Sequence, residues 1–464
     1  MIAEGVKQPA LSTGPLFPGW IARLVMGVAL GIVVLVRVLA QSNDRPWPLD
    51  DAAVCNLLVL IFGFVAALTA WIWFCFFSGY SLLARRGVFF GSFAVLAVLL
   101  ALFRVVEVTG SMVPTFAWRW TWRAPDHALG TLELSPTVPI DLATTTPDDF
   151  PQFLGPERSG WVPRPALARD WSAQGPQLVW KRSIGAGWSG FATVNGYAVT
   201  LEQRGADEWV TCYEIATGQP LWGHSIEGRH ENPMGGVGPR GTPTIFQGRV
   251  YALGATGVLR CLDGGTGKLI WSDDLRARYG LTAFADEALV QWGRAASPLI
   301  VDDLVVIPGG GPTGKAKNLA AFNAETGRLI WESENIKDNG AADQISYASP
   351  SLATIAGRRQ ILIVNESTAS GHDPATGERL WTFSWPGGSS SFASASQAVA
   401  IDANHVLLSK GYSGGAELIE LTAGGSGTIT VQSQWKMPRL LQTKFTNVVV
   451  RHGHSNIKFQ IMIL

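Results

Sequence analysis

Charged residues and cysteines are both scarce in this 464-residue chain. Charged side chains make up 16% of it, with 36 Lys plus Arg balancing 36 Asp plus Glu, whereas an ordinary soluble domain has about 25%. The zero net charge argues against a nucleic-acid-binding protein, which normally carries a basic face, and the high apolar content excludes a disordered chain. Four scattered cysteines without a CxxC or CxxCH motif exclude a disulfide scaffold, a zinc ribbon and a c-type haem site. The chain is therefore either partly embedded in lipid or unusually well buried.

Three long apolar runs lie in the first 110 residues, which hold only 12 of the charged side chains. They predict transmembrane helices over about 20–40, 52–77 and 87–106, and the second, with 26 uncharged residues, exceeds the ~20 that a bilayer requires. The loop after it carries Arg85 and Arg86, so the positive-inside rule places this loop in the cytoplasm and the later chain on the outer side. Two alternatives stay open: a cleaved signal peptide in residues 1–40, ending near VLAQS, and a buried helical hairpin in a soluble protein.

The composition changes again over residues 111–149. Trp118, Trp120 and Trp122 come first, and such aromatic clusters suit a membrane interface. The Thr/Pro-rich stretch that follows predicts an extended linker. The expected organisation is thus a transmembrane anchor at 1–110, a linker at 111–149 and a further domain at 150–464.

A repeat dominates the last of these regions. The strings ATGQPLW, GTGKLIW, ETGRLIW and ATGERLW end at tryptophans spaced 49, 60 and 50 residues apart, with weaker copies ending at Trp180 and Trp435. A second marker, Thr or Ser before an apolar run, shares the period, at Thr242, Ser297, Ser349, Ser394 and Thr446. Each unit offers about four short strands, which is typical of a propeller blade. The residues expected to dock one blade on the next are Trp180, Thr217, Gly218, Trp222, Thr266, Gly267, Trp271, Thr326, Gly327, Trp331, Thr376, Gly377, Trp381 and Trp435.

These repeats resemble the tryptophan-docking repeats, roughly AxDxxTGxxxW, of the pyrroloquinoline quinone (PQQ) propeller superfamily. The opening PQFLGPERSG also looks like the start of bacterial PQQ-like propeller proteins. The resemblance implies an all-β propeller of four-stranded blades, usually eight, preceded here by about three transmembrane helices. About six blades are visible, so the chain either closes a six-bladed ring, with the segment ending at Trp180 completing the last blade, or is incomplete at its C-terminus. One further strand is possible in IKFQIMIL.

Candidate binding residues lie in the long connections between repeats, since loops on a rigid scaffold often carry function. Cations and polar groups there could hold an anionic ligand such as a quinone carboxylate or an acidic peptide, or could be solvated loop charges. The expected channel-mouth residues are His230, Glu231, Asn232, Arg240, Arg294, Tyr347, Lys410 and Lys444. Catalytic residues are not predicted, no metal site is predicted, and GGGPTGKA lacks the hydroxyl and helix of a phosphate-binding loop.

The resemblance leaves the function open, because the superfamily contains both quinoprotein dehydrogenases and a non-enzymatic scaffold of outer-membrane assembly. The adjacent cysteine pair on which many alcohol-oxidising members stack PQQ is missing. We therefore expect a non-catalytic binding or scaffold module in a bacterial inner membrane, with the propeller on the periplasmic side, and a protein or small ligand as its partner. The alternative is a PQQ- and Ca²⁺-dependent dehydrogenase that oxidises alcohols or sugars and passes electrons to membrane quinone.

Overall fold

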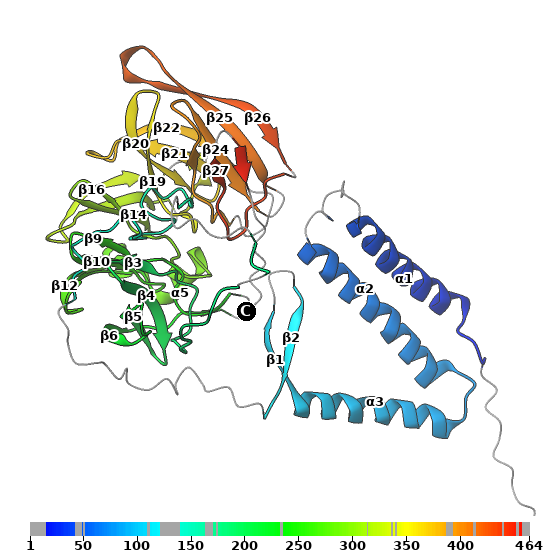
Figure 1. The fold of residues 1–464 in the computed structure, drawn as a ribbon. Helices are drawn as coiled ribbons and strands as arrows, with labels where there is room; N and C mark the ends of the chain where they lie inside the picture. Colours follow the sequence, from blue (N-terminus) through cyan, green and yellow to red (C-terminus); the bar gives the residue numbers. More distant parts are fainter. Residues whose placement is uncertain are drawn as a thin grey trace, which may run out of the picture. The chain divides into compact units, whose positions relative to one another are not determined.

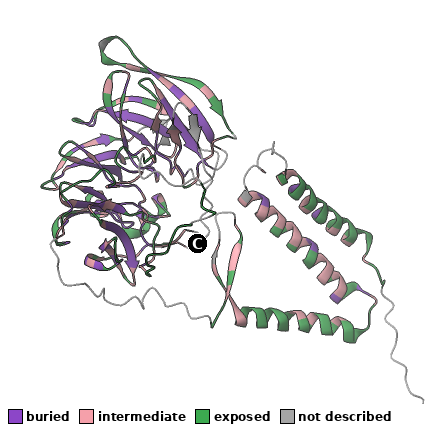
Figure 2. Ribbon diagram, viewed as in Figure 1, coloured by how far each residue is buried: buried purple, intermediate pink, exposed green. Residues whose placement is uncertain are grey.

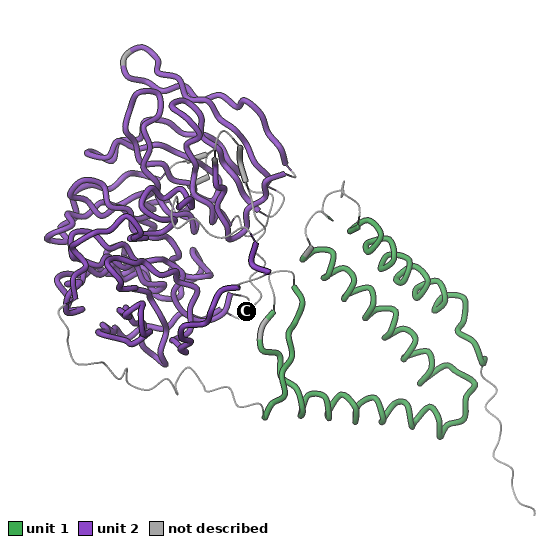
Figure 3. The backbone as a smooth tube through the Cα atoms, in the orientation of Figure 1, with its two compact units in different colours: residues 1–123 green, residues 124–464 purple. Residues whose placement is uncertain are grey.

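A computed structural model describes residues 15–41, 49, 52–108, 112–120, 140–162, 170–172, 175–232, 235–312, 314–335, 337–338, 341–386, 393–411, 414–438, 440–451 and 454–456. Trp122 of the predicted linker and the possible strand IKFQIMIL lie outside these residues. The chain divides into two compact units, residues 1–123 and 124–464 (Figure 3). Each unit is described by itself.

The first unit contains the three expected apolar helices. They are α1 (Trp20–Gln41), α2 (Ala52–Ile72), which continues as a π-helical turn over Trp73–Phe77, and α3 (Leu82–Leu102). All three are long and apolar enough to cross a membrane. Most residues of α1 and α3 are exposed, and most of α2 are half-buried (Figure 2). Large exposed apolar surfaces on a helix indicate contact with lipid or with a partner.

The third helix differs from its predicted bounds at both ends. It begins five residues earlier than expected because the Ser81 hydroxyl accepts the backbone N–H of Ala84 and caps a turn that includes Arg85. It ends at Leu102, where β1 (Phe103–Val108) pairs with β2 (Pro114–Trp118). The valines of β1 favour a strand, and Phe103 stacks on Trp118 at a centroid distance of 4.3 Å. Part of the predicted linker is therefore a hairpin strand.

The second unit is built from four-stranded antiparallel sheets, as the repeat predicts (Figure 1). The first two sheets comprise β3 (Ala192–Val194), β4 (Tyr197–Arg204), β5 (Asp207–Glu214) and β6 (Pro220–Glu227), then β9 (Thr244–Phe246), β10 (Arg249–Leu253), β11 (Val258–Asp263) and β12 (Leu269–Asp274). The third comprises β13 (Leu299–Val301), β14 (Leu304–Gly310), β15 (Lys317–Asn323) and β16 (Leu329–Glu334). Each sheet pairs its strands in chain order, which is the topology of a propeller blade.

Two further complete sheets follow. The fourth comprises β19 (Ser351–Ile355), β20 (Arg358–Val364), β21 (Thr368–His372) and β22 (Arg379–Ser384), and the fifth comprises β23 (Val399–Ala400), β24 (His405–Lys410), β25 (Gly415–Ala423) and β26 (Ile429–Met437). After them, β27 (Val449–Arg451) and β28 (His454–Asn456) form a two-stranded sheet. The described residues thus hold five complete blades and part of another, rather than six complete ones.

Two pairs of two-residue strands and two short helices occupy the connections between blades. They are β7 (Glu231–Asn232) with β8 (Gly236–Val237), β17 (Lys337–Asp338) with β18 (Ala341–Ala342), and the helices α4 (Leu275–Arg278) and α5 (Ala283–Leu289). All lie between the fourth strand of one blade and the first strand of the next. This end of the sheets, which also carries the turns between second and third strands, is called the long-loop face below.

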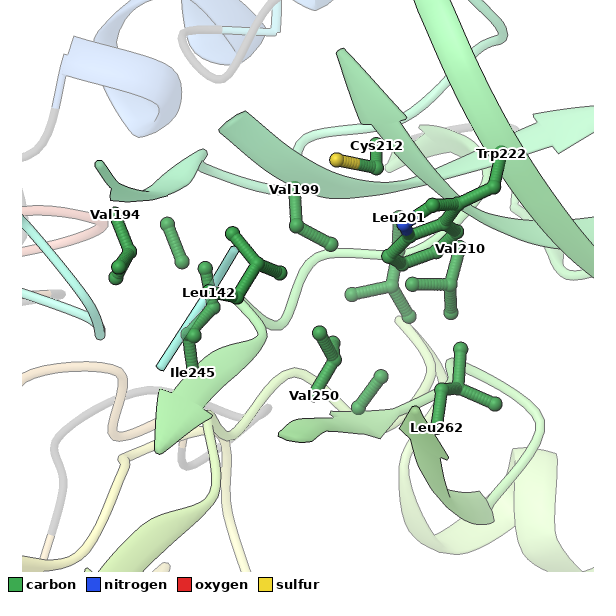
Figure 4. Packing of buried hydrophobic residues seen from close by; sticks show 12 residues of the cluster. Leu142, Val194, Val199, Leu201, Val210, Cys212, Trp222, Ile245, Val250 and Leu262 are labelled. Carbon is green, nitrogen blue, oxygen red and sulfur yellow. The ribbon is translucent and has the colours of Figure 1, made fainter. Parts of the chain in front are cut away.

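The core lies between neighbouring sheets. The first cluster joins the first two blades through apolar side chains such as Val199, Val210, Val250 and Leu262, each fully buried (Figure 4). Leu142, from the stretch predicted as a linker, belongs to the same cluster. Leu142 and the neighbouring Ile140 therefore pack on the blades, whereas residues 143–148 are exposed.

The repeat tryptophans make the same contact in successive blades. The Nε1 of Trp222, Trp271 and Trp331 donates to the carbonyls of Gly264, Ala324 and Pro374, at 2.9, 3.0 and 3.1 Å. Each acceptor lies three residues before the glycine of the next TG turn. Trp180 donates likewise to the Ile215 carbonyl at 2.7 Å, although its segment forms no strand.

The threonine and glycine of each turn have separate roles. The hydroxyls of Thr217, Thr266, Thr326 and Thr376 each accept the backbone N–H two residues on. The glycines that follow, Gly218, Gly267, Gly327 and Gly377, have positive φ and pack against the incoming indole so closely that a Cβ would lie within 2.7 Å of it. The fifth blade has no TG turn between β25 and β26, and Trp381 bonds Gln360 of its own blade instead.

Replacing Gly327 by alanine is expected to lower the free energy of unfolding by about 2–4 kcal/mol. The αL backbone costs a residue with a Cβ about 1–2 kcal/mol, and overpacking adds about 1–3 kcal/mol, because the new Cβ would lie 2.6 Å from the Trp271 ring. Gly357→Ala is the matched control, since Gly357 has φ +74° against +71° but nothing within 4 Å. Equal losses in the two variants, measured by chemical denaturation, would show that indole packing adds nothing.

Candidate functional site

The centre of the blades is occupied by a single stretch of chain, residues 149–160, here called the axial segment. The first strands of neighbouring blades contact one another, β3 with β9 and β9 with β13, so they surround the axis. Phe150 pairs with Thr193 of β3 in both directions, at 2.9 and 2.8 Å, and the Pro151 carbonyl accepts the N–H of Ile245 in β9 at 2.8 Å. The axial segment therefore lies along the innermost strands.

Arg158 anchors the far end of the axial segment. Its guanidinium donates to the carbonyls of Ser297 and Pro298 at 3.1 and 2.9 Å, and its own carbonyl accepts from the Gln397 side chain at 2.6 Å. These partners immediately precede β13 and β23, so the segment ends at the long-loop face. Burial lowers the pKa of Arg158 to about 9. Arg158 thus joins the third blade through its side chain and the fifth blade through its backbone carbonyl.

Serine and threonine side chains link the blades where the first strands begin. The hydroxyl of Ser297 accepts the N–H of Thr242, and the hydroxyl of Ser349 accepts the N–H of Ser297, both at 2.9 Å. In the next blades Ser394 bonds Ser346 through its backbone N–H at 2.7 Å. Residues of the second sequence marker, the Thr or Ser before each apolar run, therefore form hydrogen bonds between blades around the axial segment.

Four of the predicted channel-mouth residues, His230, Arg240, Arg294 and Tyr347, lie together at the long-loop face, in the connections between the first four blades. Arg294 is buried, with its guanidinium 2.7 Å from Asp286 and 2.8 Å from the Gly309 carbonyl. His230 is 4% exposed, and burial, with Arg240 nearby, lowers its pKa to about 4, so the imidazole is neutral at pH 7. Tyr347 completes this group, packed on Trp292 at a centroid distance of 5.3 Å.

Three predicted residues, Glu231, Asn232 and Arg240, are more exposed than His230 and Arg294. Glu231 pairs with Arg229 at 3.0 Å, and the Asn232 side chain donates to the Gln291 carbonyl at 3.0 Å. Burial lowers the pKa of Arg240 to about 10, and its guanidinium donates to the Gly238 carbonyl at 3.0 Å. Each of these three side chains is thus bonded to another group of the long loops.

Lys410 lies in a second group, between the fourth and fifth blades. Its ammonium donates to the carbonyls of Glu366 and Trp385, at 2.7 and 3.0 Å, and burial lowers its pKa to about 8. Burial, with Asp343 nearby, raises the pKa of Glu366 to about 7. Lys444, the last predicted residue, packs its side chain against Gly411 at the end of the fifth blade's second strand.

Sequence reasoning missed the partners that hold these groups. Asp286 lies in α5 inside a loop expected to be irregular, and Asp343 and Glu366 are single acidic residues in unremarkable contexts. Arg158 was visible only as part of PERSG. Arg158 and Glu366 bond residues 140 and 44 positions away, so only the assembled blades bring those partners together, whereas Asp286 lies eight residues from Arg294 and was missed because α5 was not predicted.

A PQQ molecule does not fit these residues. It is a flat tricyclic tricarboxylate, whereas the axial segment fills the centre of the blades through Phe150 and Arg158. Arg294 and Lys410, the buried cations that could pair with its carboxylates, are already bonded to Asp286 and to backbone carbonyls. All four cysteines are free and buried, and Cys212 and Cys261 each face the repeat tryptophan of their own blade.

Comparison with known proteins supports the fold. The family model described as outer membrane protein assembly factor BamB, a PQQ-like repeat family, matches residues 206–440. Solved structures that resemble the chain include a quinohemoprotein alcohol dehydrogenase from Comamonas testosteroni and BamB from Moraxella catarrhalis. The dehydrogenase is 16% identical, with a TM-score of 0.39, and the match covers 63% of this chain and 48% of the dehydrogenase. The M. catarrhalis BamB is also 16% identical, with a TM-score of 0.31, and the match covers 57% of this chain and 80% of that protein. No curated protein matches.

The two kinds of match cover different shares of the proteins compared. The chain spans about half the length of the alcohol dehydrogenase, of which it covers 48%. The family model, in contrast, covers just over half of this chain and includes all strands of the four-stranded sheets except β3 and β4. This chain belongs to the PQQ-like repeat family of the outer membrane protein assembly factor BamB.

Proposed function

We propose that this protein is a non-catalytic binding or scaffold module, a PQQ-like propeller held at a membrane by its three apolar helices. The observation that carries the proposal is the axial segment, which occupies the centre of the blades and is fixed there by Arg158. A rigid scaffold without an open axial site leaves its surface loops as the place to bind. The long-loop face, with its four inter-blade connections, is the proposed binding surface.

Reconstitution with PQQ and Ca²⁺ tests this proposal against the dehydrogenase alternative. The purified full chain in detergent is expected to show no cofactor-dependent absorbance and no dye reduction with alcohols or sugars. The reason is that Arg158 and its neighbours occupy the space that the quinone requires. A stoichiometric quinone spectrum together with alcohol- or sugar-dependent dye reduction would overturn the proposal and favour the quinoprotein dehydrogenase.

The proposed location is a bacterial inner membrane, with the blades on the periplasmic side. Support comes from the three helices and from Arg85 and Arg86 near the start of α3, because the positive-inside rule keeps such residues in the cytoplasm. An odd number of crossings then places the second unit on the opposite side.

Single introduced cysteines test this topology, since all four native thiols are buried. Asp402→Cys, in the fifth blade, is expected to react with a membrane-impermeant maleimide in cells whose outer membrane has been made permeable. Ala84→Cys, an exposed position beside Arg85, is expected to react only after lysis. The reverse pattern, or equal labelling of both, would contradict the periplasmic location.

A further inference from the structure

A small polar cavity opens at the long-loop face beside the second blade. It has a volume of about 90 Å³, which suits several waters or a group of a few heavy atoms, because one water needs about 10–15 Å³. Its walls come from the loop after β6, the turn between β10 and β11, and the helices α4 and α5. The lining residues used below are Arg229, His230, Thr256, Arg276, Asp286 and Glu287.

Two polar atoms on the cavity wall are buried without a hydrogen-bond partner in the described part of the chain. They are the Nε2 of His230 and the Oγ1 of Thr256, from residues that are 4% and 8% exposed. A buried polar group without a partner costs about 1–3 kcal/mol, and such groups are rare in folded proteins. Two of them on one cavity indicate a polar occupant.

The charges of the cavity favour an acceptor as that occupant. Within the described residues, the Arg276 guanidinium makes no hydrogen bond, and its nearest carboxylate oxygen, on Asp274, is 3.8 Å away. The acidic wall residue Asp286 is bonded to Arg294 at 2.7 Å. Arg229 is paired with Glu231 at 3.0 Å, and Glu287 is exposed. The Arg276 guanidinium, the Thr256 hydroxyl and the Nε2 of His230 can therefore meet a ligand in this cavity, and the guanidinium is a charged donor.

We propose that this cavity binds a carboxylate, held by the Arg276 guanidinium, the Thr256 hydroxyl and the Nε2–H of His230. Charge-assisted hydrogen bonds from arginine to a carboxylate are among the strongest in proteins. The carboxylate belongs either to a free small acid or to an aspartate or glutamate side chain of a partner protein. The proposal rests on the proposed function of the long-loop face as a binding surface, and it names the chemistry that this face recognises.

Calorimetric titration of the full chain in detergent with acetate tests the carboxylate site. Acetate is expected to bind saturably, whereas acetamide, of the same shape but uncharged, is expected not to bind. Arg276→Gln and Thr256→Val should each weaken acetate binding at least tenfold. Arg278→Gln is the matched control, because Arg278 lies in the same helix, pairs with Asp273 and does not line the cavity.

Thr256→Val separates a binding role from a purely structural one. Valine keeps the shape of threonine and removes only the unpartnered hydroxyl, so the variant should be at least as stable as the parent. Weaker acetate binding with an unchanged or raised Tm is the expected result. Unchanged acetate affinity in Thr256→Val and Arg276→Gln, or no saturable acetate binding in the parent, would overturn the carboxylate site.

A blocked tripeptide, acetyl-Gly-Asp-Gly-amide, distinguishes the two sources of the carboxylate. Tighter binding of this peptide than of acetate supports a partner's acidic side chain, and tighter binding of acetate supports a free small acid. Failure of the carboxylate site is distinguishable from failure of the proposed function. If acetate does not bind and no PQQ spectrum appears, only the carboxylate site is overturned. If a PQQ spectrum appears, the proposed function itself is overturned.

Discussion

Replacing Glu208 by leucine is expected to lower the free energy of unfolding by about 3–5 kcal/mol, because it leaves a buried cation without its partner. Glu208 in β5 lies 2.6 Å from Arg260 in β11, and both side chains are fully buried between the first two blades. The second oxygen of Glu208 accepts the N–H of Ala255 at 2.8 Å. One carboxylate therefore satisfies both a charge and a backbone donor of the neighbouring blade.

The double variant Glu208→Leu with Arg260→Met should recover most of that loss. Replacing a whole buried ion pair by apolar side chains of similar size is often neutral or stabilising. Chemical denaturation of the full chain in detergent measures both variants. The exposed pair Arg359 and Asp302, 2.8 Å apart, provides the control, and Arg359→Met should cost less than about 1 kcal/mol. A Glu208→Leu loss no larger than this control would contradict the role of the buried pair.

Arg158→Met is expected to lower the free energy of unfolding by about 3 kcal/mol and to loosen the axial segment. Methionine keeps most of the apolar stem but loses three side-chain hydrogen bonds, to Gln152, Ser297 and Pro298. Hydrogen bonds from a charged donor contribute about 1.5–3 kcal/mol each, but the variant also avoids the cost of desolvating a buried guanidinium, which offsets part of their sum. Hydrogen exchange should accelerate at the amides of Thr193 and Ile245, which bond the same segment.

The control for Arg158 is Arg182→Met, which removes an exposed side chain bonded only to Gln219 among the described residues. Its effect should stay within about 0.5 kcal/mol, as for most surface substitutions. If Arg158→Met destabilises no more than Arg182→Met, and the Thr193 and Ile245 amides keep their protection, the axial segment is not held by its arginine.

The regular parts of this fold were predictable from local sequence. The TG turns, their glycines and the tryptophans recur at intervals of about 50–60 residues, so the first four blades can be recognised from local sequence, whereas the fifth has no TG turn. The apolar runs of the first unit are equally local. The end of α3 at Leu102 was missed because apolar content alone does not distinguish a helix from a β-branched strand such as β1.

The site was less predictable, because its contacts join distant residues. The phase of the repeat predicts one shared location for His230, Arg240, Arg294 and Tyr347. It does not predict how exposed each of these side chains is. Arg294 and Lys410 turn out to be buried and bonded, and the partners of Arg158 lie about 140 residues away. The periodic pattern predicts which loops share a face, whereas only tertiary packing decides which of their charges stay available.

Site-specific photo-crosslinking in cells tests the central claim, that this propeller binds through its long-loop face. A benzophenone amino acid at Glu287, exposed at that face, is compared with one at Glu325, exposed in the turn between β15 and β16 at the opposite end of the sheets. The account predicts discrete adducts from Glu287 and none from Glu325. Adducts from Glu325 alone, or no discrete adduct from Glu287, would contradict it.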